Sequence, residues 1–172
     1  MEHPAIILGC APSLVTTGIC ILKGGSIEHT EVIKITKTPI DNLMRAERVY
    51  KITKKICEII REWKVDVIGI EQQYYIAGRK EVVVSVLELI GAIKFGVYIK
   101  FQKAVVTLTI AEIRKLTLDK AFRQDKVDIE VEKRLLPAFD DVNKRDAFLT
   151  AKATEILRQK GERRVKCLKF IS

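Results

Sequence analysis

The stretch AIILGCAPSLVTTGICIL, residues 5–22, sets the start of the fold. It holds two short apolar runs, Ala5–Cys10 and Gly18–Leu22, each of a length typical of a buried β-strand. Gly24-Gly25 then marks a tight turn, and Ile27–Ile35 alternates in part between apolar and polar residues. These segments predict three strands of an antiparallel meander.

Beyond Pro39 the pattern changes to alternating helices and strands. Apolar residues at helical spacing from Val49 to Trp63 predict an amphipathic helix that begins near residues 40–42. The apolar run Val65–Ile70, which ends in Glu71, predicts a buried strand. The remaining expected elements are a helix over Arg79–Lys100, a strand over Ala104–Leu108, helices over Ile110–Leu116 and Lys126–Leu136, with Pro137 ending the second, and a helix over Asn143–Gln159.

This order predicts an α/β fold, a mixed five-stranded sheet with helices on both faces. A chain of 172 residues without repeats or a linker predicts one domain over residues 1–160. Residues 161–172 carry four basic side chains and are expected to be a basic C-terminal tail. On the last predicted helix, Ala147, Ala151 and Thr154 form a small-residue face that would allow close packing against the sheet.

Charge narrows the choice of partner. Lys and Arg number 31 against 22 Asp and Glu, a formal net charge of +9. This balance suits a polyanion such as nucleic acid, and it equally suits the solvated Lys/Glu surface of a heat-stable protein. No run approaches the roughly 18 uninterrupted apolar residues of a membrane span, and residues 1–4 do not resemble a secretory signal. We therefore expect a cytoplasmic protein, with no membrane partner.

The cysteine and histidine residues argue against several kinds of site. The four cysteines are scattered without a CxxC pair, which predicts small buried or incidental thiols in a reducing compartment. Only two histidines are present, so a histidine-based catalytic triad or zinc hydrolase is disfavoured.

Polar residues gather where predicted strands end and where the last helix begins. They are the segment Gly9–Ser13, Glu71, and the cluster from Asp140 to Ala147. A carboxylate at the tip of a buried strand needs a cationic partner, and carboxylate and amide oxygens suit Mg²⁺ or Mn²⁺. The alternatives are a Glu71–lysine salt bridge and an N-cap cluster of Asp140, Asp141 and Asn143. Capping explains Asp146 less well.

Three segments together resemble the motifs of RuvC-type Holliday junction resolvases. ILGCAPSLVTTG, residues 7–18, resembles a first motif of apolar strand, Asp-Pro-Gly/Ser and Thr-Gly. IEQQY, residues 70–74, resembles the second, and NKRDA, residues 143–147, the third. The resemblance spans nearly the whole chain in motif order and implies a ribonuclease H-like fold.

The chain departs from this family at two positions. The first catalytic Asp of the family falls on Ala11, and the acid or His before the final Asp falls on Asn143. Because the first-strand Asp bridges both ions in two-metal nucleases, we expect this chain to be inactive or nearly so. Two origins of Ala11 remain open: replacement of an Asp to trap a substrate complex, or a natural relative that binds branched DNA without cutting.

The resemblance implies a mechanism for the active form. The acids at positions 11, 71 and 146, with the group at 143, would hold two Mg²⁺ ions, for which Mn²⁺ can substitute. Asp141 could also reach the ions from the turn before the helix. The enzyme would be a homodimer that nicks two strands of a four-way junction, with no nucleotide cofactor. The long helix over Arg79–Lys100 is the candidate dimer face, because Gly91 and Gly96 would allow close helix approach.

DNA contacts are expected from residues around this site. Tyr74, or alternatively Tyr75, would stack on an unpaired base near the junction centre. Backbone phosphates would be contacted by Arg79, Lys80, Lys115, Lys120, Arg123 and Lys126, and Lys120 and Lys126 are candidates for assisting at the cleaved phosphate.

Two further function classes are compatible with parts of the sequence. The loop from Ser13 to Gly18 also looks like the phosphate loop of the sugar kinase, actin and heat-shock ATPase superfamily, but those proteins need two such domains. A ribonuclease H-like enzyme acting on RNA–DNA hybrids, or a transposase, is the other alternative.

Overall fold

The computed structural model describes residues 3–35, 42–72, 80–118 and 139–161. Five strands form one mixed sheet in the order β3-β2-β1-β4-β5. The meander consists of β1 (Ile6–Ala11), β2 (Thr16–Lys23) and β3 (Ser26–Lys34), paired antiparallel. Strand β4 (Val67–Gln72) pairs parallel with β1, and β5 (Val105–Thr109) pairs parallel with β4. The predicted five-stranded mixed sheet is confirmed.

A two-residue turn connects β2 to β3. Lys23 pairs with Ser26, so only Gly24 and Gly25 lie between the strands. Both glycines have positive φ, 57° and 85°, the backbone that a tight hairpin of right-handed twist requires and that side chains with a Cβ disfavour. The predicted Gly24-Gly25 turn is therefore confirmed.

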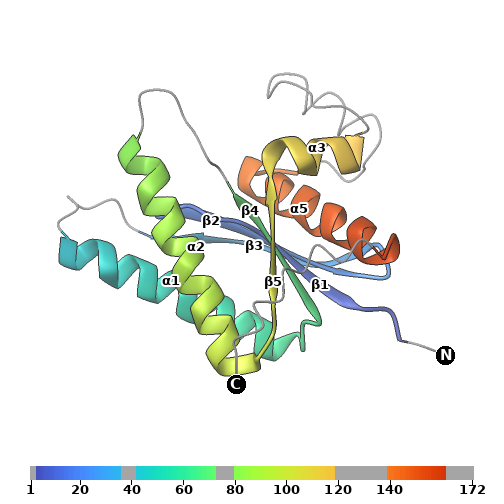
Figure 1. Cartoon of the computed structure of the whole chain (residues 1–172), viewed down its shortest axis with the longest axis horizontal. Helices are drawn as coiled ribbons and strands as arrows, with labels where there is room; N and C mark the ends of the chain where they lie inside the picture. The colour runs from blue at the N-terminus through green and yellow to red at the C-terminus, as the bar shows by residue number, and fades with distance from the viewer. Residues whose placement is uncertain (1–2, 36–41, 73–79, 119–138, 162–172) are drawn as a thin grey trace.

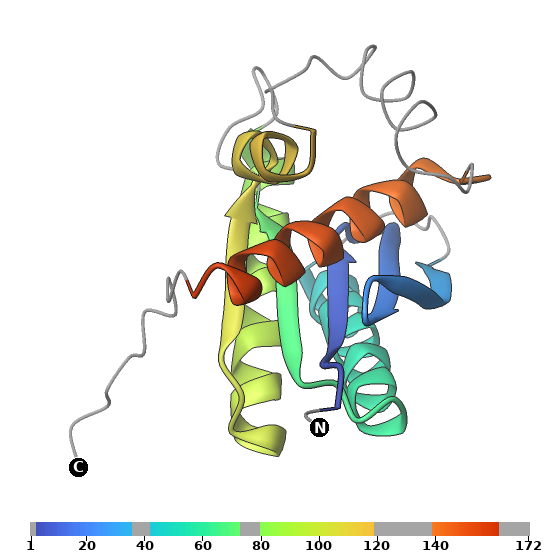
Figure 2. The same cartoon turned by 90° about the vertical axis from the view of Figure 1, so that its right-hand side faces the viewer.

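Helices cover both faces of the sheet (Figures 1 and 2). On one face lie α1 (Asn42–Glu62) and α2 (Lys80–Phe101), whose buried aliphatic residues join those of β1, β2 and β4 in one core cluster. On the other face lie α3 (Ile110–Leu118) and α5 (Val142–Gln159), which build a second cluster with Ile7, Cys20 and Leu22. Burial of these two apolar layers is the main stabilising contribution to the domain.

The predicted segments agree with the observed elements to within one or two residues at most ends. The strand predicted over Val65–Ile70 begins two residues later, at Val67, because Val65 and Asp66 bond to Ile60 and Ile6 in the connection from α1. The predicted helix over Lys126–Leu136 and the basic tail over residues 161–172, apart from Gly161, lie outside the described residues.

Helix α2 packs one side into the core and exposes several large apolar side chains on the rest of its surface. Leu89, Ile90, Ile93 and Val97 are buried against the sheet and α1. By length and composition alone, its segment Glu81–Phe101 could cross a membrane, and only 33% of its most apolar window is buried. Glu88 and Lys94 interrupt the apolar run, as the sequence indicated. The rest of this helix is exposed in the described chain, with Phe95 and Ile99 among its most exposed apolar residues.

Candidate functional site at the end of the central strands

The side chains of Ala11 and Glu71 lie on the same face of the sheet. Parallel pairing of Cys10 with Ile70 places the two residues that follow, Ala11 and Glu71, next to each other at the carboxyl ends of β1 and β4. Cys10 and Ile70 belong to the core beneath α1 and α2, so the next residue on each strand points to the opposite face, toward α5. Glu71 is buried there, 8% exposed.

Helix α5 lies directly on the backbone of the three central strands. A Cβ atom on Gly9 would stand 2.2 Å from the carbonyl oxygen of Ala147, and one on Gly69 would stand 1.9 Å from Oγ1 of Thr154. Contacts under 3.0 Å are not possible for a real Cβ, so only glycine fits at these positions. The predicted close packing of the small-residue face on the sheet is confirmed. This packing brings the first turns of α5 over the ends of β1 and β2.

The N-terminus of α5 is held by Asp141. Its Oδ1 accepts hydrogen bonds from the backbone N–H of Asn143 at 2.7 Å and from Nδ2 of Asn143 at 2.8 Å. Side-chain hydrogen bonding from Asn143 lowers the pKa of the Asp141 carboxyl, an effect that burial partly offsets. Asp141 is thus the N-cap of the helix, and neighbouring Asp140 pairs with Lys144 at 3.0 Å. The capping alternative is confirmed for Asp141, whereas Asp140 forms an exposed ion pair with Lys144.

Asp146 is paired with the residue before it. Nε and Nη2 of Arg145 donate to Oδ1 of Asp146 at 3.1 and 2.9 Å. The Arg145 side chain is only 6% exposed, and that of Asp146 is 31% exposed. Burial raises the pKa of the Asp146 carboxyl above its ordinary value, although Arg145 and Arg114 on α3 both act to lower it. Asp146 is therefore a largely desolvated acid compensated by guanidinium groups.

These groups do not form a two-metal site in the chain as it stands. Ala11 supplies no oxygen at the position where the resemblance expects the bridging ligand. One oxygen of Asp146 already accepts two hydrogen bonds from Arg145. In the part of the chain that the structure describes, no three His, Cys, Asp or Glu side chains come together as a metal ligand set. Glu71 and Asp146 alone do not fit a pair of magnesium ions.

Few of the predicted DNA-binding residues can be placed. Lys115 is exposed on α3, next in sequence to Arg114, and Lys80 is the first residue of α2. The other candidates, Tyr74, Tyr75, Arg79, Lys120, Arg123 and Lys126, lie outside the described residues.

Two site residues escaped the sequence analysis. Arg145 and Arg114 both act on Asp146. Arg145 lies within the third motif segment, but the resemblance gave it no role, and no motif contains Arg114. The available signal was the position of Arg145 beside an Asp that capping explained poorly. A buried acid without a metal requires a cation nearby, and an adjacent Arg is the nearest source.

The three cysteines that the structure describes are buried core residues and not ligands or nucleophiles of the site. Cys10, Cys20 and Cys57 are buried and unbridged, as predicted, and Cys167 lies outside the described residues. Burial raises the pKa of Cys20 to about 12 and raises that of Cys10 further still, with Glu71 adding to the rise at Cys10. Both thiols stay protonated at physiological pH, which removes their nucleophilic and metal-ligating form.

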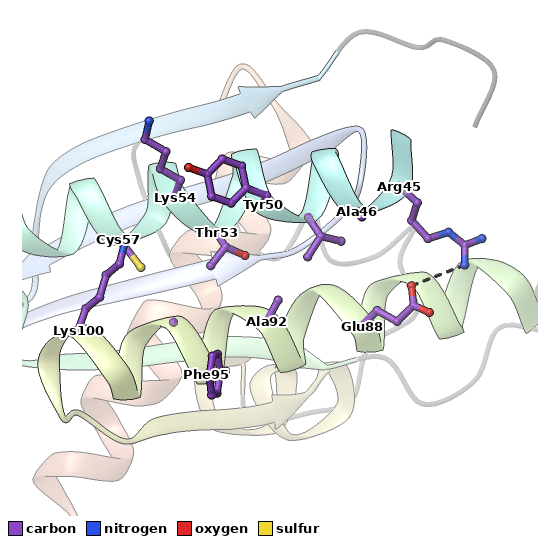
Figure 3. A pocket seen from close by; sticks show the side chains of 12 residues that line it. Arg45, Ala46, Tyr50, Thr53, Lys54, Cys57, Glu88, Ala92, Phe95 and Lys100 are labelled. Atoms are coloured by element: carbon purple, nitrogen blue, oxygen red, sulfur yellow. Dashed lines mark ion pairs between the residues drawn. The ribbon is translucent and has the colours of Figure 1, made fainter. Parts of the chain in front are cut away.

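A second feature is a cavity of about 730 Å³ between α1 and α2 (Figure 3). Its walls include Tyr50 and Phe95 and the small residues Ala46, Ala92 and Gly96. Gly96 faces Thr53 and Cys57 of α1, with its virtual Cβ 3.0 Å from Thr53 Cγ2. Gly96 therefore allows close packing of α2 on α1, and its expected role in the approach of a second chain stays a prediction. Gly91 faces open space, as a contact residue would.

Comparison with solved structures defines the fold as that of the RuvC-type resolvases. Thermus thermophilus RuvC superposes with a TM-score of 0.74 at 17% identity, covering 91% of this chain and 96% of that one. T. thermophilus RuvC in complex with a Holliday junction substrate gives 0.73 at 15% identity with the same coverage. The yeast mitochondrial Holliday junction resolvase Ydc2 gives 0.58 at 13% identity, covering 99% of this chain and 86% of that one.

The likeness lies in the structure and not in overall sequence similarity. No protein-family model matches the sequence, and no curated protein matches it. The expected ribonuclease H-like fold is confirmed by these superpositions.

Proposed function

We propose that this protein binds four-way DNA junctions as a homodimer with a resolvase fold, and that with Ala11 it does so without cutting. The observation that supports this most is the conjunction of a RuvC-type fold with Glu71 and Asp146 at one end of the sheet, where position 11 carries no ligand. The net charge of +9 supplies attraction to phosphates. A role on DNA implies the cytoplasm, at the nucleoid or, for a viral protein, in the host.

The nuclease chemistry belongs to a form with a carboxylate restored at position 11. The chemistry proposed for that form is metal-dependent phosphodiester hydrolysis, in which positions 11, 71, 143 and 146 would hold two Mg²⁺ ions, or Mn²⁺. The natural nuclease-dead junction-binding protein is the alternative origin. Under either origin of Ala11, the chain is expected to bind junctions without cutting them. The two origins differ in whether Ala11→Asp restores cleavage.

The dimer would form through the exposed apolar face of α2. Six large hydrophobic residues of this helix are at least 36% exposed, and Phe95, at 69%, is the most exposed. An exposed apolar surface of this kind marks an interaction site. Because the buried side of α2 belongs to the core of the domain, its exposed side suits a protein partner better than a bilayer.

A second copy of the chain fits this face because the protruding Phe95 side chain lies next to the cavity between α1 and α2. Phe95 is an exposed residue that lines the cavity together with small residues of α1 and α2, among them Ala46 and Ala92 (Figure 3). In a two-fold interface each patch meets its own copy, so Phe95 of one protomer would enter the hollow of the other. Within the described residues, buried Thr53 Oγ1 and Arg45 Nε have no hydrogen-bond partner, and a partner chain would supply acceptors.

The experiment that tests junction binding compares a four-way junction with linear duplex of the same sequence. Fluorescence anisotropy over a range of salt concentrations gives both affinities. We expect a preference of at least about tenfold for the junction, with affinity that falls as salt rises. Equal affinity for junction and duplex at every salt concentration would remove the proposal. A preference for RNA–DNA hybrids would favour the alternative ribonuclease H-like activity.

A further inference from the structure

We infer that the Arg145 guanidinium occupies the role of a divalent cation beside Asp146, so that this end of the sheet is compensated by a protein side chain and not by a metal. Arg145 approaches Asp146 through two nitrogens on one oxygen, at 2.9 and 3.1 Å. Its side chain is almost fully buried, at 6% exposed.

The alternative position for Arg145, in solvent, is the one that a surface arginine on a helix normally takes. Burying a guanidinium is unfavourable unless an acid pairs with it, and burying Asp146 is unfavourable without a cation. The pairing with the partly buried Asp146 carboxylate therefore favours the buried position of the Arg145 guanidinium. A metal ion that used the same Asp146 oxygen would have to displace the guanidinium.

The residue at position 11 explains why the Arg145 guanidinium can take the place of a metal ion. With Ala11, the described acids near this end include Glu71 and Asp146, and the third carboxylate expected from the motif is missing. Two carboxylates bind a hard divalent cation weakly, whereas a covalently tethered guanidinium is present at high effective concentration. The chain is thus folded in a metal-independent state.

The test uses MnCl₂ as the probe and needs no DNA, so its failure is separate from failure of junction binding. Electron paramagnetic resonance measures the loss of the free Mn²⁺ signal, and thermal unfolding is followed with and without 5 mM MnCl₂ at constant ionic strength. We expect the unaltered chain to leave the signal and its Tm unchanged. Arg145→Gln should lower Tm by roughly 5 °C without metal, because it leaves the partly buried Asp146 carboxylate without its guanidinium partner.

Manganese should then rescue the variant in part. For a dissociation constant of about 0.5 mM, 5 mM Mn²⁺ raises Tm of Arg145→Gln by roughly 4 °C. The control is the double variant Arg145→Gln with Asp146→Asn, which also removes the acid. Its Tm should be higher than that of Arg145→Gln and should not change when manganese is added.

The results separate the possibilities. If Arg145→Gln does not fold while the double variant folds, the inference is supported. It is overturned if both fail to fold, if Arg145→Gln keeps the original Tm, if manganese gives Arg145→Gln no rescue, or if the unaltered chain binds manganese as well as Arg145→Gln does.

Discussion

The backbone carbonyl oxygen of Asn143 lies over Gly18, so close that a Cβ atom on Gly18 would stand 2.0 Å from it. This contact joins the third motif of the chain to the first. It fixes the start of α5 against β2 and therefore the position of Asn143 and Asp146 relative to the ends of the central strands. The glycine of the Thr-Thr-Gly segment is a packing requirement for the site.

Substitution of this glycine should strongly destabilise the domain. Gly18→Ala forces backbone away from backbone, which is more costly than crowding of flexible side chains. We expect a loss of about 3 kcal/mol in the free energy of unfolding. Urea denaturation followed by circular dichroism measures it. The control is Glu58→Ala on the exposed side of α1, which should change the free energy of unfolding by less than about 0.5 kcal/mol. Similar effects of both substitutions would contradict the close approach of α5.

The N-cap of α5 should contribute measurable, pH-dependent stability. Asp141→Ala removes the acceptor for two Asn143 donors and should cost about 1 kcal/mol at pH 7. The pKa of Asp141 is lowered from its ordinary 3.8, so its contribution is present above pH 3.8 and is lost as pH falls further.

The control for this prediction is Asp141→Asn, which keeps a capping oxygen but does not titrate. It should match the original chain at pH 7 to within a few tenths of a kcal/mol and lose less stability on acidification. Urea unfolding at pH 7 and pH 3 provides both values. An Asn variant as unstable at pH 7 as the Ala variant would argue against capping.

The two central-strand thiols should be unreactive in the folded protein. Burial holds the pKa of Cys20 at about 12 and raises that of Cys10 as well, so almost no thiolate forms at pH 8. Brief iodoacetamide treatment followed by peptide mass analysis should find both unmodified, and both modified in guanidinium chloride. Modification of Cys10 in the native protein at the rate seen in denaturant would show that the core on the α1 and α2 face opens readily.

Phe95→Lys should convert a dimer to a monomer. A charge on the rim of the hollow between α1 and α2 is incompatible with its burial in a partner. Sedimentation velocity at micromolar concentration measures the mass, and circular dichroism confirms that the variant is folded. Val142→Lys, on an apolar residue that is 51% exposed at the start of α5, is the control and should remain dimeric. A monomeric original chain, or a dimeric Phe95→Lys, rules out this interface.

Lys115→Glu should weaken junction binding without affecting the fold. Lys115 is exposed on α3, the helix that also carries Arg114 near Asp146. Loss of one phosphate contact should reduce affinity several-fold at about 0.1 M salt and reduce the slope of log affinity against log salt by about 1. Lys23→Glu, at the opposite end of the sheet, serves as the control. Equal losses from both substitutions would mean that only net charge matters.

Local pattern made most of the fold predictable. The apolar runs, the Gly24-Gly25 turn and the helical spacing of apolar residues are determined by neighbours in sequence, and each appears in the structure. The small-residue face of α5 was also visible, because Ala147, Ala151 and Thr154 recur at helical spacing. What the sequence could not show was that Gly9, Gly18 and Gly69 form the complementary floor, since they come from three strands.

The site was predictable in position more than in chemistry. Strand ends and the start of the last helix located Glu71 and Asp146, and capping was recognised as an alternative for Asp141. The pairing of Arg145 with Asp146 depends on how deeply α5 is buried, which no local pattern reports. The contact of Gly96 with Thr53 and Cys57 of α1 was hidden for the same reason, because the neighbour of a helix face is decided by tertiary packing.

The most direct test incubates a labelled four-way junction with this chain and with Ala11→Asp, each in Mg²⁺, and measures binding and nicking together. The account predicts that both bind the junction in preference to duplex and that only Ala11→Asp produces paired, symmetric nicks. Binding without cutting by either chain would identify the natural nuclease-dead relative. Failure of both chains to prefer the junction would contradict the account.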